Sequence, residues 1–140
     1  MAFTLHGIPV TNGIAIGRAL RIAPSVMDVA HYLVAEGAEE AEEKRLLAAM
    51  QAVREELKTL RLNLPKSAPE EMGAFIDVHG MILSDPTLTE KPLELIRERR
   101  YNAEWALATQ LEFLLKQFAQ MEDEYLRERA SDVRQVVERV

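Results

Sequence analysis

The chain has 140 residues, of which 48% are hydrophobic and 29% charged, with no cysteine and a formal net charge of -6. These figures suit a soluble globular domain, exclude disulfides, thiol catalysis and cysteine metal sites, and argue against nucleic acid as the main partner. No apolar run approaches the roughly 20 residues of a membrane span, and residues 1–10 lack the basic start and apolar stretch of a signal peptide. We therefore expect a cytoplasmic protein without membrane insertion.

Residues 1–22 are predicted to form a strand arm. Aliphatic residues alternate there with small or charged ones, which is a strand pattern, at Ile14, Ile16, Leu20 and Ile22. The run from Gly13 to Gly17 lacks the glycine spacing of a phosphate loop, and no helix follows it directly. Because a lone strand is not stable, we expect the arm to complete a sheet formed elsewhere.

A looser segment over 23–37 precedes a long helix predicted over 38–62. Apolar residues recur in it at spacings typical of antiparallel helix packing, at Leu46, Met50, Val53, Leu57, Leu60 and Leu64. Ser67 and Glu70 match a capping box and predict a second helix to about Ser84. Asp85 and Pro86 predict the next helix start, and Pro92 predicts that this helix is short or kinked.

Two more helices are predicted toward the end of the chain. Asn102 is the expected cap of a long helix with a seam at Leu107, Leu111, Leu114, Phe118 and Met121. The last helix is predicted from about Asp123 to beyond Val140, either as a separate helix or continuing the preceding one through a bend. Its valines keep helical spacing to the final residue and no Gly, Asn or Pro ends it, so we expect the N-terminal piece of a longer protein.

The helix over 70–84 carries two apolar stripes at about 100° per residue. The wider stripe has the pattern of a core face and holds Met72, Phe75, Ile76, His79, Ile82 and Leu83. The second, nearly opposite, holds Ala74, Val78 and Met81, with acids near both ends. Two interpretations stay open: a central helix packed on both sides, or an exposed strip that docks a partner with an apolar centre and a basic rim.

Residues suited to catalysis or metal binding do not cluster in the sequence. His6, His31 and His79 lack the i, i+4 spacing of a helical zinc site, and His79 on the wider stripe favours a core residue over a catalyst. The acids within 39–43 favour the solvated first turn of a helix, where negative charge suits the helix dipole. We therefore nominate no catalytic or metal-binding residue.

Four stretches together carry a family resemblance. They are Gly-Ile-Pro-Val at 7–10 with Gly-Ile-Ala-Ile-Gly-Arg-Ala at 13–19; Glu70 and Glu71 through Ala74, Phe75, His79, Met81 and Asp85; Asn-Ala-Glu-Trp-Ala at 102–106; and Asp-Glu-Tyr-Leu-Arg-Glu-Arg-Ala-Ser-Asp-Val-Arg at 123–134. In this order they resemble Enzyme I of the bacterial phosphotransferase system, the phosphoenolpyruvate–protein phosphotransferase. The second and fourth are specific, whereas the first is shared in part with related phosphoenolpyruvate-using enzymes.

The resemblance implies a mainly α fold, a four-helix bundle of helical hairpins with an N-terminal β-strand arm. In that family the opening strand belongs to an α/β phosphohistidine domain, which is interrupted by a helical domain that docks the phosphocarrier HPr. Residues 1–22 would be the strand arm of the otherwise missing phosphohistidine domain. Residues 23–140 would be the helical HPr-binding domain, truncated at its C-terminal helix.

The resemblance also implies a role in sugar uptake. The full enzyme takes a phosphoryl group from phosphoenolpyruvate with Mg²⁺, stores it on a histidine and passes it to HPr, and it dimerises through its missing C-terminal part. None of His6, His31 and His79 lies in the family's Thr-Ser-His motif. We therefore expect this chain to be catalytically inert, without a Mg²⁺ site, and monomeric or weakly associating.

By residue-for-residue carry-over, the surface facing HPr comprises Glu70, Glu71, Ala74, Val78, Met81, Asp85, Leu88 and Arg129. The chain departs from the family at two places. Thr11 and Asn12 replace a frequent Ser-Pro, and Pro86 and Thr87 stand where some members carry acids, which weakens one edge of the dock.

Two alternatives remain open beside this reading. One is a nitrogen-regulatory paralogue of the same enzyme, and the other is a stand-alone helical adaptor. An adaptor has no use for an unpaired strand arm. The chain opens directly at that arm rather than with a sensor domain, which favours the sugar-transport branch.

Overall fold

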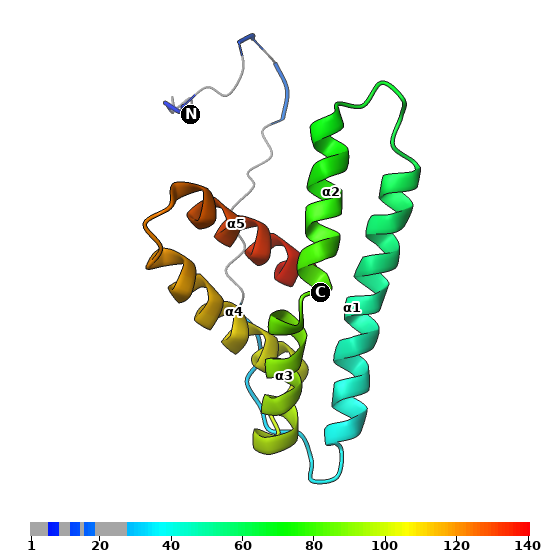
Figure 1. The fold of residues 1–140 in the computed structure, drawn as a ribbon, viewed down its shortest axis with the longest axis vertical. Helices are drawn as coiled ribbons and strands as arrows, with labels where there is room; N and C mark the ends of the chain where they lie inside the picture. Colours follow the sequence, from blue (N-terminus) through cyan, green and yellow to red (C-terminus); the bar gives the residue numbers. More distant parts are fainter. Residues whose placement is uncertain (1–5, 9–11, 15, 19–27) are drawn as a thin grey trace.

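The computed structural model describes residues 6–8, 12–14, 16–18 and 28–140. These residues form five helices: α1 (Glu39–Leu62), α2 (Glu70–Leu83), α3 (Pro86–Arg99), α4 (Ala103–Ala119) and α5 (Glu124–Arg139). Figure 1 shows α1 and α2 as an antiparallel hairpin, with α4 and α5 forming a second hairpin. The predicted mainly α bundle of helical hairpins is confirmed.

Helices α2 and α3 follow each other almost end to end along α1, so that the pair occupies one position of the bundle (Figure 1). The break falls at Asp85, which has extended backbone angles and whose carboxylate accepts a hydrogen bond from the Thr87 backbone N–H at 2.8 Å. Pro86 follows in the first helical position, where its missing N–H costs nothing. The predicted cap at Asp85 is therefore confirmed.

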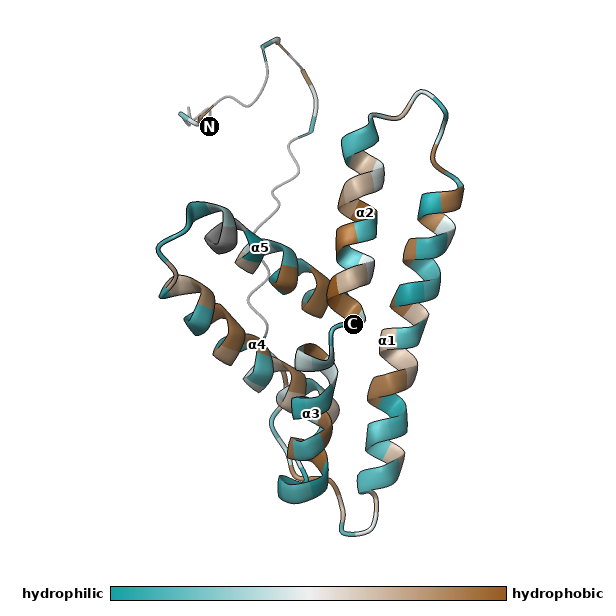
Figure 2. Ribbon diagram, viewed as in Figure 1, coloured by the Kyte–Doolittle hydropathy of each residue, from teal (hydrophilic) through white to brown (hydrophobic). Residues whose placement is uncertain are grey.

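The core takes buried residues from all five helices. Leu46, Met50, Val53 and Leu57 line the buried face of α1, and Val133, Val136 and Val137 do the same for α5. Figure 2 shows that hydrophilic and hydrophobic residues alternate along the helices. Leu60 is exposed by 44% and Leu64 lies beyond the end of α1, so the predicted seam fades toward the tip of the hairpin.

Two predicted local features differ from the structure, and one alternative that the sequence left open is decided. Pro69, not Ser67, is the N-cap of α2, and no side chain caps that helix, so the capping box does not form. Pro92 lies inside α3, which continues through it to Arg99 because the proline ring is fully buried in the core. Helix α5 is separate from α4, since Asp123 caps it by accepting from the Tyr125 N–H at 2.8 Å.

The segment before α1 is fastened to the corner between α3 and α4. Leu33 forms an isolated antiparallel bridge with Tyr101, and the Val34 N–H donates to the Arg100 carbonyl at 2.8 Å. No strand occurs among the described residues of the predicted arm, where Ile14 and Ile16 are fully exposed. Leu20 and Ile22 lie outside the described residues, so the strand arm and the domain boundary at residue 22 remain predictions.

Candidate partner-docking surface

Helix α2 has three differently used faces. Ile76 and Gly80 face α1, and His79 and Leu83 are buried on the side of α5. The third face carries Ala74, Val78 and Met81. Ala74 is exposed, Val78 is half-buried, and Met81 is 71% exposed. The helix is thus packed on two sides, as one interpretation supposed, but its second apolar stripe is not one of the packed sides.

Acidic side chains mark both ends of this outward stripe. Glu70 and Glu71 are exposed in the first turn of α2, where negative charge is favourable next to the unpaired N–H groups. Asp85 is exposed beyond the C-terminal end, and its carboxylate is fixed by its hydrogen bond to Thr87. The surface is therefore apolar at its centre and acidic at its two ends.

A pocket of about 350 Å³ opens where α2, α3, α4 and α5 come together. It brings three of the predicted site residues to one place, Asp85, Leu88 and Arg129, beside apolar side chains that include Phe118. Leu88 is only 1% exposed and belongs to the core. It forms part of the pocket floor but exposes almost no surface. This differs from the expectation that Leu88 faces outward with the other site residues.

Arg129 is held in place by its own helix. Its guanidinium donates to the Tyr125 hydroxyl, lies 5.0 Å from the centre of the tyrosine ring, and pairs with Asp132 at 3.6 Å. The hydrogen bond to Tyr125 raises the pKa of Arg129. A permanently charged, positioned guanidinium thus stands on the same pocket as the Asp85 carboxylate.

His79 is a core residue, as its position on the wider stripe predicted. It is 7% exposed, its ring centre lies 4.1 Å from that of Phe75, and its Nε2 has no hydrogen-bond partner among the described residues. Burial lowers its pKa, while the charge of Asp132 opposes this shift. His6 and His31 are exposed. The described residues hold no group of His, Asp and Glu suited to a metal ion.

Two residues of the wider stripe are not in the core. Met72 and Phe75 are 48% and 46% exposed, because the upper part of the α1–α2 hairpin extends beyond the end of α5 (Figure 1). Periodicity within α2 gave no signal of this, since exposure here depends on the position of another helix. In the part of the chain that the structure describes, no helix has the length and apolar character to cross a membrane.

The fold is a helical bundle in which one face of α2 carries exposed apolar side chains between acidic residues. The family described as "PEP-utilising enzyme, N-terminal" matches residues 6–129. The chain belongs to this family, and the resemblance seen in the sequence is confirmed.

The curated relatives and solved structures agree with this family. The chain is 61% identical over 140 residues to a phosphoenolpyruvate-protein phosphotransferase of Cupriavidus necator, covering 100% of this chain and 24% of that protein. It is 36% identical over 137 residues to the protein of that name from Geobacillus stearothermophilus, covering 98% of this chain and 23% of the relative. The chain thus spans about a quarter of the length of these relatives.

Two solved structures share the fold. A solution structure of Enzyme I (nEIt) matches with a TM-score of 0.73 and 26% identity, over 82% of this chain and 46% of that one. The N-terminal domain of a nitrogen Enzyme 1 matches with a TM-score of 0.70 and 28% identity, over 79% of this chain and 45% of that one. The two are about equally similar to this chain in fold and in sequence identity.

Proposed function

We propose that this chain is the carrier-docking part of a phosphoenolpyruvate–protein phosphotransferase and binds HPr through the outward face of α2. The observation that carries the proposal is the exposure of Met81 and Ala74 on a helix whose other two sides are packed. In a monomeric bundle such a stripe has no stabilising role. It is explained if a second protein covers it.

The chemistry of the surface fits a small partner that carries basic groups around an apolar patch. Met81 has an unbranched side chain that adapts to the shape it meets. Exposed ion pairs from Glu70, Glu71 or Asp85 contribute only about 0–1 kcal/mol each. The apolar strip should therefore supply most of the affinity, and the acids should speed and orient the encounter.

The phosphorylated carrier is expected to bind more weakly than the free carrier. A phosphohistidine would bring negative charge next to the exposed acids at the ends of α2. This repulsion would help the product to leave. Equal affinities of the two carrier forms at low salt would contradict this part of the proposal.

The phosphoryl transfer itself belongs to the parent protein. We propose that the parent takes a phosphoryl group from phosphoenolpyruvate with Mg²⁺, holds it on a histidine, and passes it to HPr in sugar uptake, so that one transfer becomes two shorter ones. His79 is too buried to accept it, and the described residues do not fit a Mg²⁺ site. We therefore place both functions outside these residues, in a cytoplasmic and dimeric parent, with this chain alone inert and monomeric or weakly dimeric.

The test is a heteronuclear NMR titration of the labelled chain with unlabelled HPr. Amide shifts should concentrate at Glu71, Ala74, Val78, Met81 and Arg129. The variant Met81→Asp should abolish binding by placing a charge in the apolar centre. Met72→Asp is the matched control, because Met72 is half exposed on another face of the same helix, and it should bind as the unmodified chain does.

The same titration separates the alternatives. Tighter binding of a nitrogen-branch carrier than of HPr would favour the nitrogen-regulatory paralogue, whose solved relative has the same fold. A folded chain that shows no shifts with either carrier would contradict the docking proposal and favour a helical adaptor.

A further inference from the structure

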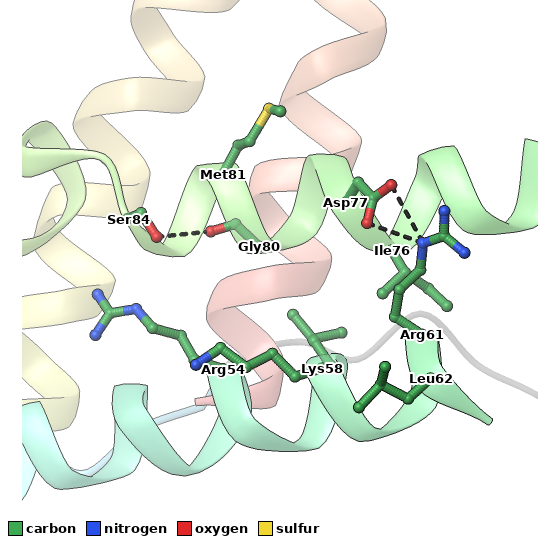
Figure 3. A pocket seen from close by; sticks show the side chains of 10 residues that line it. Arg54, Lys58, Arg61, Leu62, Ile76, Asp77, Gly80, Met81 and Ser84 are labelled. Atoms are coloured by element: carbon green, nitrogen blue, oxygen red, sulfur yellow. Dashed lines mark hydrogen bonds and ion pairs between the residues drawn. The ribbon is translucent and has the colours of Figure 1, made fainter. Parts of the chain in front are cut away.

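A second groove runs between α1 and α2, away from the carrier-facing stripe. Its volume is about 710 Å³, and the apolar side chains of Leu62 and Ile76 line it (Figure 3). Gly80, which also lines it, lies six residues after Ala74 and hence about 120° around the helix from it. Of the carrier-facing residues only Met81 reaches the groove, at its edge.

One wall of the groove is cationic. Arg54, Lys58 and Arg61 recur at spacings of four and three residues, so they share one side of α1. Asp77 is the carboxylate among the lining residues, and it pairs with the Arg61 Nε at 3.1 Å across the groove. Three cations against one carboxylate make the groove locally positive in a chain with a net charge of -6.

The cations differ in how well they are satisfied. The Lys58 ammonium pairs with Glu55 on its own helix at 2.9 Å, in an exposed position that contributes little. Arg54 donates from Nη2 to the Leu83 carbonyl at the end of α2. Its Nε is buried and has no hydrogen-bond partner among the described residues.

Small residues keep the groove open. A Cβ placed on Gly80 would meet no atom within 4 Å, and Ser84 lies one turn further along the same side of α2. Small residues between two antiparallel helices leave a groove into which a ridge of side chains from a third helix can pack. The geometry points to an acidic amphipathic helix of a partner protein as the occupant of this groove. Its apolar ridge would lie on Leu62 and Ile76, with its acids along the cationic wall.

The inference does not depend on carrier binding, and it can be tested with a defined probe. The probe is a fluorescein-labelled helical peptide of about 16 residues, roughly 24 Å long, with leucines on one face and glutamates on both flanks. A twin peptide with lysine in place of every glutamate is the control. Fluorescence anisotropy should show saturable binding of the glutamate peptide and none of the lysine twin. Amide shifts should cluster at Lys58, Arg61 and Gly80.

Two variants of the chain sharpen the test. Gly80→Leu places an apolar side chain in the groove at a position where the added Cβ meets no atom within 4 Å, and it should weaken peptide binding about tenfold or more while HPr binding is unchanged. Lys58→Gln should weaken it several-fold. Lys91→Gln is its matched control, because Lys91 forms an ion pair of the same i, i+3 spacing with Glu94 on α3. It should have no effect.

Three results would overturn the inference. The first is equal binding of the two peptides, because the groove would then not distinguish acidic from basic side chains. The second is peptide-induced shifts centred on Ala74 and Val78. The third is full peptide affinity in a folded Gly80→Leu variant, with folding checked by circular dichroism.

Discussion

The Glu42 carboxylate, in the first turn of α1, accepts a hydrogen bond from the backbone N–H of Ala103, the first residue of α4, at 2.7 Å. Asn102 is the N-cap of α4 but does not cap it with its side chain. Its Oδ1 accepts from the Tyr32 N–H at 3.2 Å and its Nδ2 donates to Glu104 at 2.8 Å. The start of one helix therefore caps the start of another that lies 61 residues further along the chain.

Replacing Glu42 by alanine should lower the free energy of unfolding by about 1–2 kcal/mol, the usual cost of losing a helix cap together with a charged hydrogen bond. Urea denaturation followed by circular dichroism measures the change. Glu40→Ala is the control, since Glu40 also lies in the first turn of α1 but pairs only with exposed Lys44. It should change stability by less than about 0.5 kcal/mol, and equal losses in both variants would contradict the cross-helix cap.

Stability should fall as the pH drops from about 4.5 toward 2. Arg45 donates to both Glu42 and Glu104, with shortest distances of 2.6 Å. Its hydrogen bond is the main cause that lowers the pKa of Glu104 from 4.5 to about 2, and it also lowers the pKa of Glu42. A lowered carboxyl pKa means that the unfolded chain takes up protons first, so the stabilisation is complete above 4.5 and is lost on acidification.

Urea denaturation at several pH values between about 2.5 and 5.5 measures this dependence. The variant Arg45→Met removes the donor, and its unfolding free energy should vary less steeply with pH over the same interval. Both carboxylates lie at least partly in contact with solvent, so the effect should also shrink at high salt. An unchanged pH slope in Arg45→Met would show that other carboxylates dominate acid unfolding.

Burial of His79 adds a second pH dependence at higher pH. Its pKa in the folded chain is lowered from 6.5 mainly by burial, with a further lowering from Arg139 and an opposing effect of Asp132. The unfolded state therefore binds a proton first as the pH falls below 6.5, and the folded state loses stability there. His79→Leu removes both the titration and the unpaired Nε2. Between pH 8 and pH 5 the unfolding free energy of this variant should therefore fall less than that of the unmodified chain.

Asp132→Asn provides the complementary variant. It removes the charge that favours the protonated His79 ring, so its stability should fall more steeply between pH 8 and pH 5 than that of the unmodified chain. Thermal denaturation at both pH values measures the difference. A flat profile for all three proteins would contradict the account of His79.

The sequence correctly predicted the helix starts that are determined by neighbouring residues in the chain. Asp85 with Pro86, and Asp123, cap their helices through N–H groups two residues ahead, an interaction that depends only on neighbouring residues. The capping box at Ser67 failed although its pattern was present, because Pro69 takes the N-cap position instead. The continuation of α3 through Pro92 was also missed, since burial of the ring against other helices outweighs a local penalty.

The sequence predicted which face of α2 carries the candidate surface, but it did not predict how deeply each of its residues is buried. Helical periodicity placed Ala74, Val78 and Met81 on one face, and all three lie there. Leu88 was included because of the family resemblance. Its burial in the core depends on how the helices pack, which no local sequence pattern shows. The meeting of Asp85 with Arg129 likewise depends on how α5 crosses the joint between α2 and α3.

Tyr125 should act as a positioning residue for Arg129 in carrier binding. Its hydroxyl and ring both contact the guanidinium, which restricts a long side chain that would otherwise lose freedom on binding. Tyr125→Ala should weaken HPr binding several-fold in an isothermal titration, and Tyr125→Phe, which keeps the ring, should weaken it less. Arg129→Gln should be at least as weak as Tyr125→Ala. Because Tyr125 acts through Arg129, adding Tyr125→Ala to Arg129→Gln should cost nothing further, and a fully additive loss would show that Tyr125 contacts the carrier itself.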